Sequence, residues 1–242
     1  MQKTHSVCRG VLGVAVMAAI LAWTTDVSAG ESASVQALKS KAIAGDVDAQ
    51  LSLARAYDFG NGVRSSKGEA ARWYEAAANQ GNASAQNSIG SLYLDGEGVS
   101  KNPVKACEWF GKSAAQDDVQ GTGNWAYCFD FGIGVTQDRA KGAALYEKAA
   151  SAGDLQSMLN IGVDYWKGVG VERDLTKGYM WLDLVRFYSQ TGNANRTLKW
   201  RARGALDAMT KEISSDIKAQ GEAMSRDWDK ANRGKVQQSP AY

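Results

Sequence analysis

The sequence predicts an all-α fold, an α/α solenoid of tandem helix-turn-helix repeats with a C-terminal helical cap. Two observations predict it: the chain repeats every 36 residues, and each period carries the same helix-ending and helix-starting signals. A fixed period of about 20 to 50 residues is typical of repeats that bury their apolar faces by stacking. The period is carried by a valine register and two glycine registers: Val63, Val99, Val135, Val171; Gly60, Gly96, Gly132, Gly168; and Gly62, Gly98, Gly134, Gly170.

Each unit begins with a predicted helix that ends at a glycine pair. In the first unit, Leu53, Ala54 and Tyr57 are spaced so that they share one helix face. The Gly60 and Gly62 pair supplies the positive φ angles that end a helix and turn the chain. Gly-x-Gly also occurs in phosphate-binding loops, but those follow a strand, whereas each pair here follows a predicted helix. We therefore interpret the pairs as structural turns.

A second helix is predicted three residues after each valine. Good N-cap residues stand at these four positions: Ser66, Asn102, Asp138 and Asp174. The second helices carry large aromatic side chains that we expect to be buried against the next repeat, namely Trp73, Trp109 and Trp181. Small residues share one register of the first helices and are expected to let paired helices approach closely: Ala54, Gly90, Ala126 and Gly162.

The first 29 residues are typical of a cleaved secretory signal peptide. Lys3 and Arg9 precede an apolar run at residues 11–23, and Val27-Ser28-Ala29 provides the small residues of a cleavage site. The alternative is a retained membrane anchor, but the run is shorter than the roughly 20 residues of a spanning helix. We therefore expect a periplasmic or secreted protein with no transmembrane segment in the mature chain.

Beyond the repeats, helices are expected at 195–209 and 211–228, with Gly192-Asn193 before them and Thr210 as the N-cap of the last one. These helices would cover the apolar end of the stack. The expected organisation is a signal peptide at 1–29, an N-terminal capping helix at 30–44, four 36-residue repeats at 45–184, C-terminal capping helices at 185–231 and a disordered tail at 232–242.

Composition excludes several function classes. The chain has 28 Lys and Arg residues against 26 Asp and Glu residues, and this near-neutral balance gives no electrostatic sign of nucleic-acid binding, so we expect no nucleic-acid partner. Its only histidine, His5, lies in the expected signal peptide, which leaves no imidazole for triad catalysis or for common zinc sites. Paired acids such as Asp46 with Asp48 lie at repeat junctions, where carboxylates favour helix N-termini. We predict no catalysis, no metal and no cofactor.

The repeat unit resembles a known family. The pattern Ala49-Gln50, Leu53, Tyr57, Gly60-x-Gly62-Val63, Ala70, Trp73-Tyr74, Ala77-Ala78 is similar to the Sel-one-like (Sel1-like) repeat, a relative of the tetratricopeptide repeat. The resemblance covers residues 45 to 184. It implies a scaffold that holds macromolecular complexes together, in signalling, envelope assembly, exopolysaccharide control or host contact, and it implies no enzymatic activity.

The third and fourth units depart from the pattern. Asp117 stands where the other units have Gly45, Gly81 and Gly153, so the turn into the third unit is expected to differ. Thr122 and Met158 stand at the position that is glutamine in the first two units, Gln50 and Gln86.

The predicted binding face lies on the first helices, which usually line the concave side of such stacks. Its positions vary in chemistry while the core positions do not, as expected of a site placed on a repeated scaffold. The alternative is partial burial against a neighbouring helix. The predicted protein-binding residues are Arg55, Phe59, Ser91, Asp95, Asn124, Tyr127, Phe131, Asn160 and Lys167, with Tyr127 and Phe131 as exposed aromatic anchors.

Two cysteines, Cys107 and Cys128, remain after the expected signal peptide. They lie on consecutive predicted helices at similar distances from the connecting turn. In an oxidising compartment they could form a disulfide that stabilises the fold by about 3 kcal/mol. The alternative is two buried thiols whose Cβ vectors diverge. The sequence leaves both possibilities open.

The most consistent function is an exported scaffold that binds a protein partner of the cell envelope through its concave face, as an adaptor or regulator. A glycan or peptidoglycan binder that uses groove aromatics or Trp166, Trp200 and Trp228 is the alternative. A hydrolase built on carboxylates is a weaker alternative.

Overall fold

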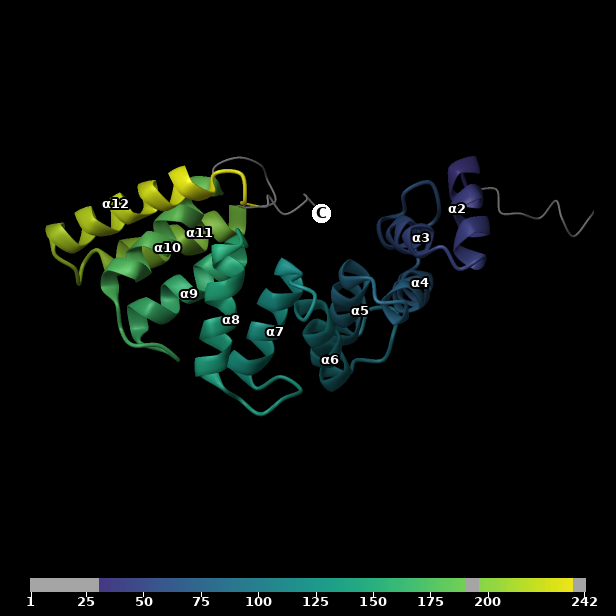
Figure 1. Ribbon diagram of the computed structural model, residues 1–242, viewed down its shortest axis with the longest axis horizontal. Coiled ribbons are helices and arrows are strands. Elements are labelled where there is room, and N and C mark those ends of the chain that lie inside the picture. The colour runs from purple at the N-terminus through teal and green to yellow at the C-terminus, as the bar shows by residue number, and fades with distance from the viewer. Residues whose placement is uncertain (1–30, 190–195, 237–242) are drawn as a thin grey trace, which may run out of the picture.

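The computed structural model describes residues 31–189 and 196–236, and every regular element within these ranges is an α-helix. From α2 to α11 each helix packs against the next one, α12 packs against α10, and the helices follow one another along a curved stack (Figure 1). The predicted all-α solenoid is therefore confirmed. The helices are α2 (Ala33–Ile43), α3 (Val47–Phe59), α4 (Lys67–Asn79), α5 (Ala83–Asp95), α6 (Pro103–Ala114), α7 (Val119–Phe131), α8 (Arg139–Ser151), α9 (Leu155–Lys167), α10 (Leu175–Tyr188), α11 (Arg196–Met209) and α12 (Ser215–Asn232).

The glycine pairs have the turn geometry that the sequence predicts. The first glycine of each pair caps the first helix of its unit in the left-handed region, with φ of +74° at Gly60 and +80° at Gly96. The second glycine also lies against the previous unit. A Cβ on Gly98 would be 2.2 Å from the carbonyl carbon of Lys67, at the start of α4. The second glycine therefore sets how closely consecutive repeats stack.

We predict that Gly98→Ala destabilises the protein more than Gly81→Ala does. Both residues have positive φ, at +71° and +93°, but a Cβ on Gly81 would have no atom within 4 Å. Gly81→Ala therefore measures backbone strain alone, about 1 kcal/mol, whereas Gly98→Ala adds a clash with backbone and is expected to cost at least about 3 kcal/mol. Urea unfolding of both variants measures the difference, and equal midpoints would contradict a stacking role for Gly98.

The predicted N-caps of the second helices are confirmed. Ser66 accepts a hydrogen bond from the Glu69 amide at 3.3 Å, and Asn102 accepts one from the Lys105 amide at 3.0 Å. Asp138 and Asp174 cap α8 and α10 in the same way. These side chains satisfy first-turn amides that have no partner within the helix.

The turn into the third unit does not differ, contrary to expectation. Asp117 has a φ of +56°, in the same left-handed region as the glycines of the other units. Its carboxylate accepts a hydrogen bond from the Lys148 ammonium at 2.7 Å, which lowers the pKa of Asp117. Short polar side chains such as that of aspartate tolerate this backbone conformation better than most. The turn is therefore kept without its glycine.

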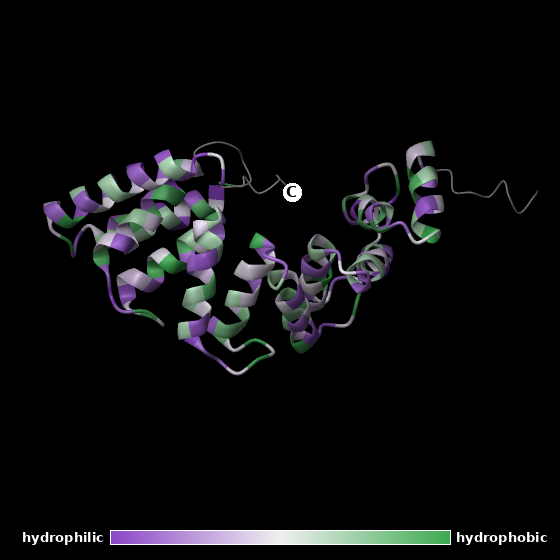
Figure 2. Cartoon of the chain, in the orientation of Figure 1, coloured by the Kyte–Doolittle hydropathy of each residue, from purple (hydrophilic) through white to green (hydrophobic). Residues whose placement is uncertain are grey.

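The apolar core forms two clusters that meet at α7. The first contains side chains of α2 to α6 together with Cys128, and the second begins at Ala126 and continues into α11. Hydrophobic and hydrophilic residues alternate along the helices, as expected when one face of each helix is buried (Figure 2). The expected burial of Trp73, Trp109 and Trp181 is confirmed, since each is at most 6% exposed.

The C-terminal helices pack on α10, and the last one begins later than expected. Ser214, not Thr210, is its N-cap and accepts a hydrogen bond from the Ile217 amide. The Thr210 hydroxyl instead donates to the Asp207 carbonyl, because residues 210–213 form the turn that follows α11. Val236 packs against the second core cluster, so the ordered chain extends further than the predicted start of the tail.

Several expectations concern residues that the structure does not describe. The predicted signal peptide at 1–29, the break at Gly192-Asn193 and residues 237–242 of the predicted tail lie outside the described residues. None of the helices in the described ranges is both long enough and apolar enough to cross a membrane.

Candidate protein-binding groove

Two adjoining cavities form a groove over the first helices of the repeats. The first has a volume of about 970 Å³ and is lined mainly by α3 and α5. The second has a volume of about 740 Å³ and is lined by α5, α7 and α9, with one residue from α11. Asn87, Ser91 and Gln120 line both cavities, so the two form one continuous surface, called the groove below.

The structure brings together most of the predicted binding residues in this groove. Four of them line the first cavity: Arg55, Phe59, Ser91 and Asp95. Five line the second: Ser91, Asn124, Tyr127, Phe131 and Asn160. Lys167 lines neither cavity and lies over the Trp166 ring, 5.4 Å from its centroid. The predicted set therefore describes one surface, with Lys167 outside it.

Two exposed aromatic side chains lie in the second cavity. Tyr127 and Phe131 are one helical turn apart on α7, and their ring centroids are 4.7 Å apart. They are 39% and 58% exposed, although aromatic side chains of this size are normally well buried in a monomer. Paired aromatics in a concave surface are typical anchors for a protein partner.

Side-chain amides surround this aromatic pair. The Asn124 amide donates to the Asn87 side-chain oxygen at 2.8 Å, which joins α7 to α5 across the groove. The Gln156 amide donates to Asn160 at 2.9 Å on α9. Each amide offers both a donor and an acceptor, so together they match the backbone of an extended peptide.

The first cavity is polar and fixed by hydrogen bonds. The Lys67 ammonium donates to Asp58 at 2.7 Å and forms an ion pair with Glu97 at 2.8 Å, and these two carboxylates raise the pKa of Lys67. The Tyr74 hydroxyl donates to the other Asp58 oxygen at 3.1 Å. Burial raises the pKa of Tyr74, so its hydroxyl stays protonated. This network holds the cavity wall in one arrangement.

Helix α9 also carries a buried acid, which lines neither cavity of the groove. Asp164 on α9 is 8% exposed, and its burial, aided by the nearby Asp130 carboxylate, raises the pKa of Asp164 to about 7. Burial also raises the pKa of Asp130. A pair of shifted acids can indicate catalysis, but it also arises from packing alone. Within the described residues, no group of three or more His, Cys, Asp or Glu side chains is arranged to hold a metal ion.

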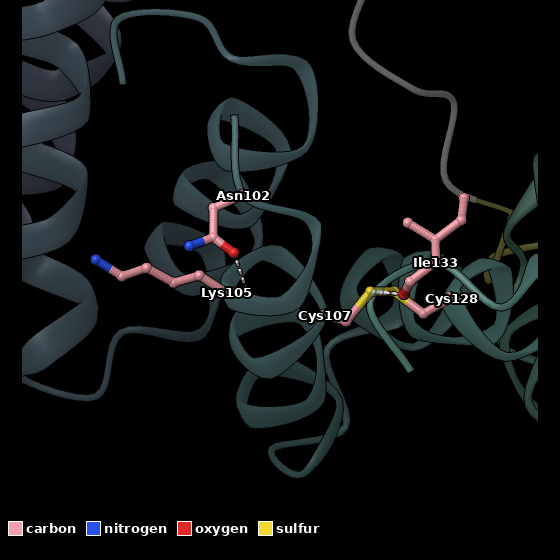
Figure 3. The surroundings of a disulfide bond; sticks show 5 residues. All are labelled: Asn102, Lys105, Cys107, Cys128 and Ile133. Atoms are coloured by element: carbon pink, nitrogen blue, oxygen red, sulfur yellow. Dashed lines mark hydrogen bonds between the residues drawn. A yellow bond between two sulfur atoms is a disulfide. The ribbon is translucent and has the colours of Figure 1, made fainter. Parts of the chain in front are cut away.

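Cys107 and Cys128 form a disulfide at the junction of the second and third repeats. Their Cα atoms are 6.1 Å apart, within the range that a disulfide can span. Cys107 comes from α6 and Cys128 from α7, and the two side chains point toward each other (Figure 3). The Cys107 sulfur also lies 2.8 Å from the Ile133 carbonyl oxygen, which a reduced thiol would use as an acceptor. Both cysteines are buried.

Sequence reasoning missed many residues of the groove, and three of them are informative. Asn87 on α5 is next to Ser88, Gln120 lies one helical turn before Asn124 on α7, and Arg201 comes from α11. The helical positions beside Ser88 and Asn124 could have indicated the first two residues. Arg201 follows the last repeat, so the 36-residue period gives no signal for it.

Comparisons with known proteins agree with this architecture. The Sel1 repeat family model matches residues 47–82, 83–118, 122–154 and 155–184. The structure is similar to that of a protective antigen of uropathogenic Escherichia coli strains that displays an SLR fold, with 26% identity and a TM-score of 0.72 over 86% of this chain and 44% of that chain. It is also similar to a Sel1 repeat protein from Oxalobacter formigenes, with 25% identity and a TM-score of 0.64 over 86% and 77% of the two chains.

The chain thus spans less than half the length of the Escherichia coli antigen. No curated protein sequence matches it. The family resemblance seen in the sequence is confirmed by four matched repeats and by both structures.

Proposed function

Because the chain belongs to the Sel1 repeat family, whose repeats generally serve as non-catalytic scaffolds for protein interactions, we propose that it binds a protein partner in the groove. The observation that carries this proposal is the exposed pair Tyr127 and Phe131 within a concave surface of amides. Helices packed on both sides hold α7 in place, so the partner meets a surface that is already formed. Binding to such a preorganised surface avoids the cost of ordering it.

The proposal includes export and a partner in the cell envelope. Two observations support export. Lys3 and Arg9, the apolar residues 11–23 and the small residues before Gly30 have the order of a secretory signal peptide. The disulfide suits an oxidising compartment. The protein then acts as an adaptor or regulator that positions its partner, without chemistry of its own.

The groove is tested by photo-crosslinking in intact cells. We predict that a benzoylphenylalanine in place of Phe131 captures one defined partner, and that one in place of Val104 does not. Val104 is a matched control because it is 53% exposed on α6 and lines neither cavity of the groove.

The double variant Tyr127→Ala, Phe131→Ala is expected to weaken affinity for the captured partner by at least about 2 kcal/mol, roughly thirtyfold. Titration calorimetry with the purified partner measures this loss, and circular dichroism checks the fold. Unchanged affinity in the double variant, or equal capture at Val104, would contradict binding in the groove.

A further inference from the structure

Helix α11 exposes a cationic and aromatic face that extends beyond the groove and shares only Arg201 with it. Leu206 and Met209 pack into the second core cluster, which fixes one side of this helix. The opposite side carries Trp200, which is 76% exposed and is the most exposed large hydrophobic residue of the described chain. The cations on either side of it complete what we call the α11 face: Arg196, Lys199, Trp200, Arg201 and Arg203.

The charges of this face are poorly compensated. Arg203 has only a long contact of 3.9 Å with Asp207, and both side chains are more than 70% exposed. The other three cations of the face have no carboxylate within salt-bridge distance among residues 31–189 and 196–236. Lys230 and Arg233, near the end of α12, contrast with them, because their ion pairs with Asp227 and Asp229 measure 3.1 Å and 2.9 Å. Like charges one helical turn apart repel each other, so an anionic partner would stabilise the α11 face.

We propose that the α11 face binds an acidic segment of the protein that occupies the groove. Three of its four cations are arginines, whose planar guanidinium groups bind carboxylates through two parallel hydrogen bonds. Tryptophan and arginine are also the residues that most often dominate the energy of protein interfaces. The chemistry of the face therefore matches aspartate and glutamate side chains beside an apolar one.

The position of Arg201 connects this face to the groove. Arg201 lines the second cavity together with Tyr127 and Phe131, whereas the other three cations and Trp200 line a separate cavity on the far flank of the same helix. A chain that leaves the groove beside Arg201 and crosses α11 over Trp200 would therefore reach them. An anionic lipid surface fits less well. The apolar side of α11 is already used in the protein core, and only Trp200 would remain to enter a bilayer. This proposal rests on the proposed function, because it assumes that the groove ligand is a protein.

The test measures fluorescence anisotropy of a labelled synthetic peptide that alternates glutamate and serine around a central phenylalanine. A second peptide with glutamine in place of glutamate is the control ligand. We expect the full chain to bind the acidic peptide at least about tenfold more tightly than the glutamine peptide at low salt. The triple variant Arg196→Glu, Lys199→Glu, Arg203→Glu is expected to abolish this preference, and Trp200→Ala is expected to weaken binding of the acidic peptide about fivefold.

The variant Lys218→Glu, Arg226→Glu, Lys230→Glu on α12 makes the same change in charge elsewhere and is expected to keep the preference. Circular dichroism confirms that each variant folds. The proposal is overturned if the two peptides bind equally, or if the α12 variant loses as much of the preference for the acidic peptide as the α11 variant does. It is also overturned if the protein binds phosphatidylglycerol vesicles, used as a separate probe of anionic lipid, but does not bind the acidic peptide. If Tyr127→Ala, Phe131→Ala keeps the acidic peptide and loses the crosslinked partner, both proposals stand. If it keeps both ligands, the groove proposal fails, and with it the claim that the acidic segment belongs to a groove ligand, while acidic-peptide binding by the α11 face itself is retained.

Discussion

Reduction of the Cys107–Cys128 disulfide is expected to lower the free energy of unfolding by about 3 kcal/mol and to divide one unfolding transition into two. The bond closes a loop with a sequence separation of 21 residues, and opening that loop returns conformational freedom to the unfolded chain. Urea unfolding of the same purified protein, with and without a phosphine reductant, measures both effects without any change of side chain.

The expected division into two transitions comes from the position of the disulfide. The two apolar clusters meet at α7. Among the described residues, Cys128 is the one fully buried α7 side chain of the first cluster, and Trp125 packs against that cluster from a partly buried position. In a repeat protein each unit contacts only its neighbours, so cooperativity depends on every junction. The disulfide is a covalent connection at the boundary between the two buried clusters. We therefore expect the repeats on either side to unfold separately once it is opened.

The double variant Cys107→Ala, Cys128→Ala supplies an independent measurement. It is expected to unfold in two steps whether or not reductant is present, and reductant should have no further effect on it. Export, as proposed above, predicts that the protein recovered from cells has no free thiol at either position after denaturation. Identical unfolding curves for the oxidised and reduced protein would contradict a role for the disulfide in coupling the two halves.

Local signals explain which parts of the fold were predictable. The ends of the helices follow from Gly60 and its equivalents and from caps such as Ser66, because these effects act within a few residues. The start of α12 was misplaced because Thr210 and Ser214 are both acceptable caps. The choice between them depends on the turn after α11 and on the packing of Ile213, which are tertiary features.

The groove was predictable only as far as the period extends. Tyr127 and Phe131 could be placed because first helices share a register, whereas Arg201 belongs to a helix outside the repeats. The disulfide was left open because sequence spacing does not give the direction of a Cβ bond. The sequence also does not show why Gly121 is a glycine. A Cβ on Gly121 would lie 2.6 Å from the Cβ of Ser113 in the preceding repeat, and no local pattern reveals this contact.

Substitution of Asp164 by asparagine is expected to stabilise the protein above neutral pH and to change little near pH 4. The pKa of Asp164 is raised to about 7 in the folded protein, mainly by burial and further by Asp130. An unfolded aspartate has a pKa of about 3.9, so between about pH 4 and pH 7 the folded chain keeps a proton that the unfolded chain has lost. Stability therefore falls as the pH rises through this window, and it stays low above it.

The size of the effect follows from the shift and from the groups around the carboxyl. Asp130 disfavours the charged form of Asp164, while Arg139 and Lys167 favour it, and partial access to water reduces the whole effect. After this discount, Asp164→Asn is expected to gain about 2 kcal/mol at pH 8, because it removes the cost of a buried negative charge. Chemical unfolding from pH 4 to pH 8 measures the gain.

The matched control for Asp164→Asn is Glu108→Gln, which removes one negative charge from an exposed position on α6. It is expected to leave the difference in stability between pH 4 and pH 8 close to that of the unmodified protein.

Asp130→Asn should move the fall in stability to lower pH, because it removes the neighbouring charge that helps to raise the pKa of Asp164. A stability profile of Asp164→Asn that parallels the unmodified protein from pH 4 to pH 8 would show that the carboxyl is already charged in the folded state. In that case Arg139 and Lys167 would outweigh burial at this position, and Asp164 would be a paired charge and not a buried neutral group.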